Sequence, residues 1–298
     1  QHFDVIHDNQ TLADGILDLQ QAGLPVVTTI HHPISRDLSV ALAGASGWRA
    51  RLLVRRWHSF LTMQTRVAAQ LNHIVTVSSA SAADIATDFG VLPNAIQVIP
   101  NGVDTELFRA LPDVTRKSDQ LIATASADAP LKGLAVLLQA FKLLSVDRPA
   151  LQLMLIASPK PGGDTEALIS QLQLGDRIHF VGGVSHADIV RLYAESTVAV
   201  VPSLYEGFGL PAVEAMASGI PLVSSDGGAL AEVVGDGGLL VPAGDAKALA
   251  EAIDAVLSDP GLAAELINRG QQRAHRTFSW SVCARLMVEQ YQRCIDLC

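Results

Sequence analysis

Residues 201–214 read VPSLYEGFGLPAVE, and this stretch decides the fold. The β-branched run that ends at Val201 is typical of a strand buried on both faces of a parallel sheet. Pro211 suits the first position of a helix, where its missing N–H group is not needed. Because Gly207 and Gly209 lie between these elements, the stretch predicts a strand, a tight loop and a helix, as in an α/β domain.

The same loop has the composition of an anion site. Gly207 and Gly209 let backbone N–H groups approach a ligand closely. The helix start that follows adds unpaired donors and a positive partial charge, which suit a phosphate. Glu206 and Glu214 flank the loop, and beside an anion they are better placed to accept hydrogen bonds from sugar hydroxyls. Spacing alone leaves open whether Glu214 binds a ligand or only interacts favourably with the positive end of the helix dipole.

Two further loops likewise lie between the end of a predicted strand and the start of a predicted helix. Residues 129–133, APLKG, follow an apolar run, and Lys132 can reach a phosphate as a point charge, although a single lysine there is usually solvated surface. Asp226, Gly227 and Gly228 follow another run. Ligands bind at the carboxyl edge of open α/β sheets, so these three loops predict a ligand site.

Short apolar runs alternate with amphipathic ones along the chain, which favours βαβ units with parallel sheets. The runs that we expect to be strands are Phe3–His7, Val26–Ile30, His73–Val77, Ile96–Ile99, Leu121–Ser126, Leu151–Ala157, Ile178–Val181, Thr197–Val201, Pro221–Ser224 and Gly238–Val241.

A turn signal at residues 100–102 and a polar segment at 111–120 indicate a domain boundary. We expect a first domain over 1–110, a second over 111–277, and a C-terminal helix over 278–298 that returns to the first domain. The second domain has the strands of a complete doubly wound unit. The first begins on a strand and holds few, so we expect that its N-terminal half is missing; a naturally smaller domain is the alternative.

Charge, hydropathy and cysteine content argue against several classes of function. The net charge of −9 argues against nucleic acid as a partner, because phosphate binding needs a basic face. The chain contains no apolar run long enough to span a membrane. Cys283, Cys294 and Cys298 fit neither a zinc site nor a redox pair, so we expect reduced thiols in a cytoplasmic protein.

Residues 48–57, WRARLLVRRW, predict a basic helix with tryptophans. Trp48, Arg51, Arg55 and Arg56 are the residues that we expect to touch the anionic inner face of a membrane, or a phosphate-bearing acceptor. An ordinary solvated helix face is the alternative.

His31, His32 and Pro33 follow a predicted strand of the first domain and fall on its carboxyl edge, as do His7 and Asp8. A metal site is not expected there, because the side chains of adjacent histidines diverge and no carboxylate is placed to help them.

Together these residues resemble the family-four retaining glycosyltransferases of the GT-B fold, also called group 1 glycosyltransferases. The stretch at 201–214, with two glutamates around GFGLP, is the most specific part of the likeness. The matching stretches, in family order, are HFDVIHD (2–8), VVTTIHHP (26–33), VTVSSASAADI (75–85), IPNGVDTELF (99–108), LKGLAVLLQAF (131–141), FVGGV (180–184), VPSLYEGFGLPAVEAMASGIPLVSSDGGALAEVV (201–234) and LVPAGD (240–245).

The resemblance implies two Rossmann-like domains facing a cleft, with a nucleotide-sugar donor held by the second. It implies that Glu206 contacts the transferred sugar, Lys132 neutralises the pyrophosphate, and His31 lies beside the sugar. It also implies that Glu214 contacts the ribose and the backbone near Val184 the base. The other residues expected at the donor are Gly207, Phe208, Gly209, Leu210 and Ser126.

The chain departs from the family pattern in two places. Ser126 stands where the family usually has an arginine, six residues before the lysine, so one phosphate-binding cation is absent or supplied elsewhere. The glycine-rich loop that opens the family's first domain is also absent from this sequence.

The function implied is transfer of a hexosyl group from a UDP- or GDP-hexose to the hydroxyl of a lipid, glycan or small molecule, with retention. No metal ion or other cofactor is expected, because Lys132 and the loop amides supply the charge stabilisation. The alternatives are a nucleotide-binding module without transferase activity, and a related epimerase or phosphorylase.

Overall fold

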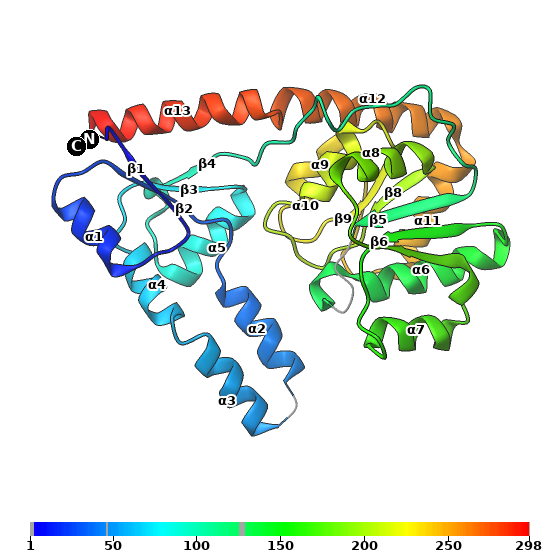
Figure 1. Cartoon of the computed structure of the whole chain (residues 1–298), viewed down its shortest axis with the longest axis horizontal. Coiled ribbons are helices and arrows are strands. Elements are labelled where there is room, and N and C mark those ends of the chain that lie inside the picture. Colours follow the sequence, from blue (N-terminus) through cyan, green and yellow to red (C-terminus); the bar gives the residue numbers. More distant parts are fainter. Residues whose placement is uncertain (1–2, 46, 125–128, 298) are drawn as a thin grey trace. The chain divides into compact units, whose positions relative to one another are not determined.

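The computed structural model describes residues 3–45, 47–124 and 129–297. The chain folds into two compact units, Gln1–Pro100 with Cys283–Cys298, and Asn101–Val282 (Figure 1). The division lies at Pro100 rather than at the expected residue 110. The reason is that the Val103 N–H group donates to the carbonyl of Phe278 at 2.7 Å, which ties residues after 100 to the second unit.

The first unit is built on a four-stranded parallel sheet in the order β1-β2-β3-β4. Its elements are β1 (Ile6–Asn9), α1 (Asp14–Gln21), β2 (Val26–Thr29), α2 (Ser35–Gly44), α3 (Trp48–Trp57), α4 (Leu61–Ala68), β3 (Ile74–Thr76), α5 (Ser79–Phe89), η1 (Pro93–Ala95) and β4 (Ile96–Val98).

Successive residues of β3 serve opposite faces of this sheet, as the period of two in a strand requires. Ile74 packs with Ile85 and Phe89 of α5 in one cluster. Val75 packs in another with Cys294 of α13 (Trp280–Asp296). The last part of α13 therefore covers one face of the first sheet.

The second unit has a six-stranded parallel sheet in the order β10-β9-β8-β5-β6-β7. Its strands are β5 (Gln120–Thr124), β6 (Gln152–Ile156), β7 (Ile178–Val181), β8 (Val198–Val201), β9 (Leu222–Ser225) and β10 (Leu239–Val241). The order reverses between β5 and β8, so the unit is doubly wound as expected. That reversal opens a crevice at the carboxyl ends of these two strands, where ligands of such sheets bind.

Helices cover both faces of the second sheet (Figure 1). Leu137 and Phe141 of α6 pack with Leu249 and Ile253 of α11 in one large buried cluster. The remaining elements of the unit are η2 (Pro130–Lys132), α6 (Leu134–Asp147), α7 (Asp164–Leu172), η3 (Gly175–Arg177), α8 (His186–Glu195), α9 (Leu210–Ala217), α10 (Leu230–Val234), η4 (Gly235–Gly237), α11 (Ala246–Ser258) and α12 (Pro260–Thr277).

Each expected strand is present, with small differences at the ends. The largest is in β1, which begins at Ile6 because its pairing with β2 starts there, while Phe3 is 77% exposed. A second difference concerns Pro211, which is the second residue of α9 rather than the first. Its missing N–H group is unneeded at that position too.

Candidate active site

The loops that follow β5, β8 and β9 are joined to one another at the crevice of the second sheet. The Leu204 N–H group donates to the carbonyl of Leu131 at 2.8 Å, which links the loops after β8 and β5. The Ala229 N–H group donates to the carbonyl of Glu206 at 2.9 Å, which links the loops after β9 and β8. The three loops that the sequence placed on one edge thus form a continuous backbone surface.

Glycines make this close contact between the loops sterically possible. A Cβ atom on Gly133 would lie 2.7 Å from the carbonyl carbon of Pro202, closer than real Cβ atoms come. A Cβ atom on Gly227 would lie 2.6 Å from the carbonyl oxygens of both Ser203 and Leu204. Backbone therefore packs on backbone here, and no side chain fits between the loops.

Lys132 and Glu206 form an ion pair at this junction. Lys132 Nζ lies 2.8 Å from Glu206 Oε1, and the side chains are 35% and 12% exposed. The Ser203 hydroxyl donates to the same carboxylate oxygen at 2.8 Å. Glu206 Oε2, by contrast, has no hydrogen bond to any residue in the described part of the chain. Two donors thus fix the carboxylate and leave one oxygen for a ligand hydroxyl.

The loop before α9 presents open donors. The backbone N–H groups of Phe208, Gly209 and Leu210 make no hydrogen bond with any residue that the structure describes. Gly209 caps the helix with φ of 98°, a conformation that favours glycine. The Phe208 ring is buried edge-on against Phe278, with 5.6 Å between centroids. That packing anchors the loop, and its backbone N–H groups are the kind of donors that an anion site uses.

Glu214 is the fifth residue of α9, one turn behind this loop. The helix dipole acts mainly on the first turn, so the dipole does not account for a carboxylate there. Burial raises the pKa of the Glu214 carboxyl, and the nearby His186 opposes that shift. Burial and the charge of Glu214 likewise raise the pKa of the Tyr193 hydroxyl. Within the described residues the Glu214 carboxylate has no hydrogen bond.

Three other residues are expected at the donor, namely Val184, Leu210 and Ser126. Val184 lies half-buried in the loop between β7 and α8, next to Ser185, which caps α8. Leu210 is 41% exposed at the start of α9. Ser126 lies outside the described residues.

His31 belongs to the first unit, where it follows β2. Its backbone N–H group donates to Gln10 Oε1 at 2.8 Å, and its ring Nε2 lies 2.9 Å from Asn9 Oδ1. Burial lowers the pKa of the His31 imidazole, and the neighbouring His32 and His7 lower it further. The ring is therefore neutral at pH 7, where it can serve as a hydrogen-bonding group.

Helix α3 has no buried residue among those described. Trp48 and Trp57 are 70% and 78% exposed, and the Arg49 guanidinium lies 5.3 Å from the centre of the Trp48 ring. Together with α2, this helix projects away from the first sheet (Figure 1). No described helix is both long and apolar enough to cross a membrane.

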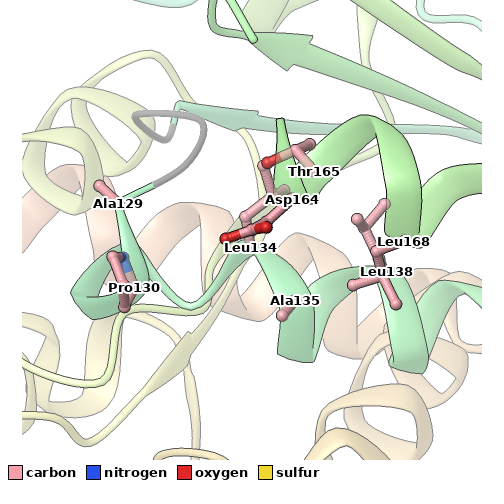
Figure 2. A pocket seen from close by; sticks show the side chains of 8 residues that line it. All are labelled: Ala129, Pro130, Leu134, Ala135, Leu138, Asp164, Thr165 and Leu168. Atoms are coloured by element: carbon pink, nitrogen blue, oxygen red, sulfur yellow. The ribbon is translucent and has the colours of Figure 1, made fainter. Parts of the chain in front are cut away.

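A cavity of about 200 Å³ beside the loop of Lys132 was not predicted from the sequence. Figure 2 shows that it lies between α6 and α7, with mostly apolar walls. Leu134 and Leu138 have the helical spacing that is typical of core residues. The sequence therefore gives no sign that they line a cavity rather than fill the core. The lining residues are Ala129, Pro130, Leu134, Ala135, Leu138, Asp164, Thr165 and Leu168.

Comparison with known proteins agrees with this geometry. Residues 112–273 match the family model "Glycosyl transferases group 1", and residues 1–107 match "Glycosyltransferase Family 4". The chain therefore belongs to the group 1 glycosyltransferases. It is 47% identical to the MMP alpha-(1->4)-mannosyltransferase of Mycolicibacterium hassiacum over 297 residues, which cover 98% of this chain and 71% of that protein. It is also 29% identical to the phosphatidyl-myo-inositol mannosyltransferase of Mycolicibacterium smegmatis, covering 97% of this chain and 71% of that one.

Solved structures show the same fold. Sucrose-phosphate synthase from Thermosynechococcus elongatus superposes with a TM-score of 0.79 at 27% identity, over 99% of this chain and 75% of that one. HepE from Anabaena, in complex with UDP, gives 0.78 at 22% identity, over 98% and 79%. The expected GT-B fold, with two Rossmann-like domains on parallel sheets, is confirmed.

Proposed function

We propose that the protein transfers a hexosyl group from a nucleoside diphosphate sugar to an acceptor hydroxyl, with retention of anomeric configuration. One observation carries the proposal. At the crevice of the second sheet, the Lys132–Glu206 pair lies in the loops that also hold the open N–H groups of residues 208–210. A cation and unpaired amides suit a diphosphate, while carboxylates suit the hydroxyls of sugar and ribose.

The proposed roles follow from the state of each group. Lys132 and the amides of Phe208 to Leu210 stabilise the charge that develops on the departing diphosphate. Glu206 is held by two donors through Oε1, so it orients a sugar hydroxyl through Oε2 rather than attacking carbon. Glu214 accepts from the ribose, and His31 contacts the sugar. The acceptor attacks on the face that the diphosphate leaves, and the leaving phosphate takes its proton. We propose that no metal ion is required.

The relatives support a choice of sugar. Two of them are mannosyltransferases by name, and one is 47% identical to this chain over 297 aligned residues. HepE, whose fold is similar, is described in complex with UDP-glucose. We propose mannose first and glucose second as the transferred hexose.

A donor screen tests the proposal. Thermal unfolding of the chain is followed with UDP, GDP, ADP and their hexose conjugates, all at one common concentration. The nucleoside diphosphate that the site recognises should stabilise the chain by about 2.7 kcal/mol where this concentration is about 100 times its dissociation constant, because it binds the folded state alone. The other nucleotides, with weaker affinity, should stabilise the chain less. Incubation of that donor with mannoside acceptors, with and without EDTA, should then release the nucleoside diphosphate, and NMR should show a retained anomeric centre.

The results separate the competing functions. Binding without any product would indicate a nucleotide-binding module. An isomerised sugar nucleotide, or a sugar phosphate formed with added phosphate, would indicate an epimerase or a phosphorylase. An inverted product, or loss of activity in EDTA, would contradict the mechanism proposed.

We also propose that the protein binds the anionic cytoplasmic face of a membrane through α3. On a helical wheel, the half-buried Ala50 and Val54 lie on one side of α3, and α3 contacts α2. Trp48 and Leu52 lie on the opposite, outward side, with arginines on both flanks. Interfacial helices combine such exposed apolar side chains with cations that meet lipid phosphates.

Cosedimentation with vesicles tests this contact. Binding should rise when phosphatidylglycerol is added to phosphatidylcholine vesicles, and replacing Arg51, Arg55 and Arg56 with Gln should weaken it about fivefold per arginine, from about 1 kcal/mol each. The matched control neutralises Arg191, Arg269 and Arg285, which are 71%, 51% and 62% exposed on other helices. Equal loss in both triple variants, or no preference for anionic vesicles, would show that α3 is an ordinary solvated helix.

A further inference from the structure

The loop after β1 holds the backbone of the loop that carries His31. The Gln10 side-chain amide bridges two adjacent residues there. Its Oε1 accepts from the His31 N–H group at 2.8 Å, and its Nε2 donates to the His32 carbonyl at 3.1 Å. Gln10 itself has φ of 59°, a left-handed conformation that costs a residue with a side chain about 1–3 kcal/mol. Residues kept in such conformations cluster at functional sites.

Asn9, the last residue of β1, holds the imidazole. Its register partner in β2 is Thr29, two residues before His31. Asn9 Oδ1 lies 2.9 Å from His31 Nε2. An amide oxygen only accepts hydrogen bonds, so Nε2 must carry the proton. In the neutral ring the remaining nitrogen, Nδ1, then has its lone pair available.

We infer that Asn9 and Gln10 are positioning residues: they fix the orientation and the tautomer of His31, so that Nδ1 accepts a hydrogen bond from a substrate hydroxyl. This inference rests on the proposed function, in which His31 contacts the sugar. The charges that bear on the ring are those of His7 and His32, and both favour the neutral form. The other ionisable group of this loop, Asp8, is occupied by the Thr11 hydroxyl and by the N–H groups of Thr11 and Leu12.

The turn itself does not depend on Asn9. The Asp8 carboxylate binds the backbone of Thr11 and Leu12, and Leu12 is buried with 1% exposure, so the turn has its own anchors. The Asn9 side chain is exposed and packs little. Changes at Asn9 should therefore alter the ring of His31 while leaving the stability of the first unit almost unchanged.

The test replaces Asn9 with Asp. A carboxylate at this distance stabilises the imidazolium and raises the His31 pKa by about 1–3 units. Because the neutral ring is the active form, the acid limb of the kcat/KM profile should move to higher pH by the same amount. Asn9→Leu should lower kcat/KM about tenfold without that move, since it removes one hydrogen bond. The control is Asn94→Asp, an equal charge change at an exposed site in η1.

A second readout needs no turnover. In wild-type protein, the ¹⁵N signals of the His31 ring, assigned with a His31→Gln variant, should show the proton on Nε2. Asn9→Leu and Gln10→Ala should give a mixture of both tautomers. A proton on Nδ1 in wild type, or an unmoved acid limb in Asn9→Asp, would overturn the inference. Failure of the proposed function looks different, because wild type would then form no hexosyl transfer product at any pH.

Discussion

Replacing Lys132 with Met should lower kcat/KM for hexosyl transfer about 10²–10³-fold, which corresponds to about 2.7–4 kcal/mol of lost charge stabilisation. Methionine keeps most of the apolar stem of the side chain and removes the charge. The departing diphosphate would then have only the amides of the 208–210 loop to stabilise it. Steady-state kinetics with saturating acceptor measures the loss.

Part of this loss should come through Glu206. The two side chains are joined at 2.8 Å, so Lys132→Met also removes one of the two donors that hold the carboxylate. The double variant Lys132→Met/Glu206→Gln should therefore lose less than the sum of the single losses, because coupled neighbours are not additive. Strict additivity would contradict the shared role.

Two comparisons isolate the effect of Lys132. Lys132→Arg should not restore full activity, because the planar guanidinium cannot occupy the place of a compact ammonium beside Glu206. Lys247→Met removes the same charge from an 80% exposed side chain on α11 and should keep wild-type kinetics. Near-normal turnover in Lys132→Met would rule out its role at the diphosphate.

The strands of the fold were predictable because they are short aliphatic runs, and β2, β3, β8 and β9 are buried at every residue. Runs such as Leu151–Ala157 and Thr197–Val201 stand out from the amphipathic helices on either side. The ends were less predictable, since they depend on pairing with other strands. β1 begins only where β2 can pair with it, and Val103 joins the second unit through Phe278, far along the sequence.

The candidate site was predictable as a set of loops on one edge, though not as a set of contacts. Lys132 and Glu206 are 74 residues apart, and spacing alone gives no sign that their side chains meet. Glu214 is the fifth residue of α9, one turn into the helix as the sequence indicated, and its contact with a ligand stays a prediction. The bridge from Gln10 to the His31 loop joins two strand ends, so it depends on the register between β1 and β2.

Gly133→Ala should be among the most damaging single substitutions in the second unit. The new Cβ atom would lie inside the contact distance of the Pro202 carbonyl group, which is backbone and cannot rotate away. In addition, φ of 65° at Gly133 is unfavourable for alanine by about 1–2 kcal/mol. We expect a total loss of about 3–5 kcal/mol in the free energy of unfolding of this unit, seen as a fall of about 10 °C in its melting temperature.

Gly162→Ala separates the cost of the left-handed backbone conformation from the cost of the steric contact with Pro202. Gly162 has nearly the same φ, 69°, in the same unit, and a Cβ atom there would meet nothing within 4 Å. This variant should lose only the backbone term, about 1–2 kcal/mol, and should bind the donor like wild type. Gly133→Ala must instead push the loop of Lys132 away from the loop of Glu206, so its donor affinity should fall even at temperatures where it is fully folded. If both variants lost equal stability and kept equal affinity, the close backbone contact between these loops would not be what holds the ion pair at the site.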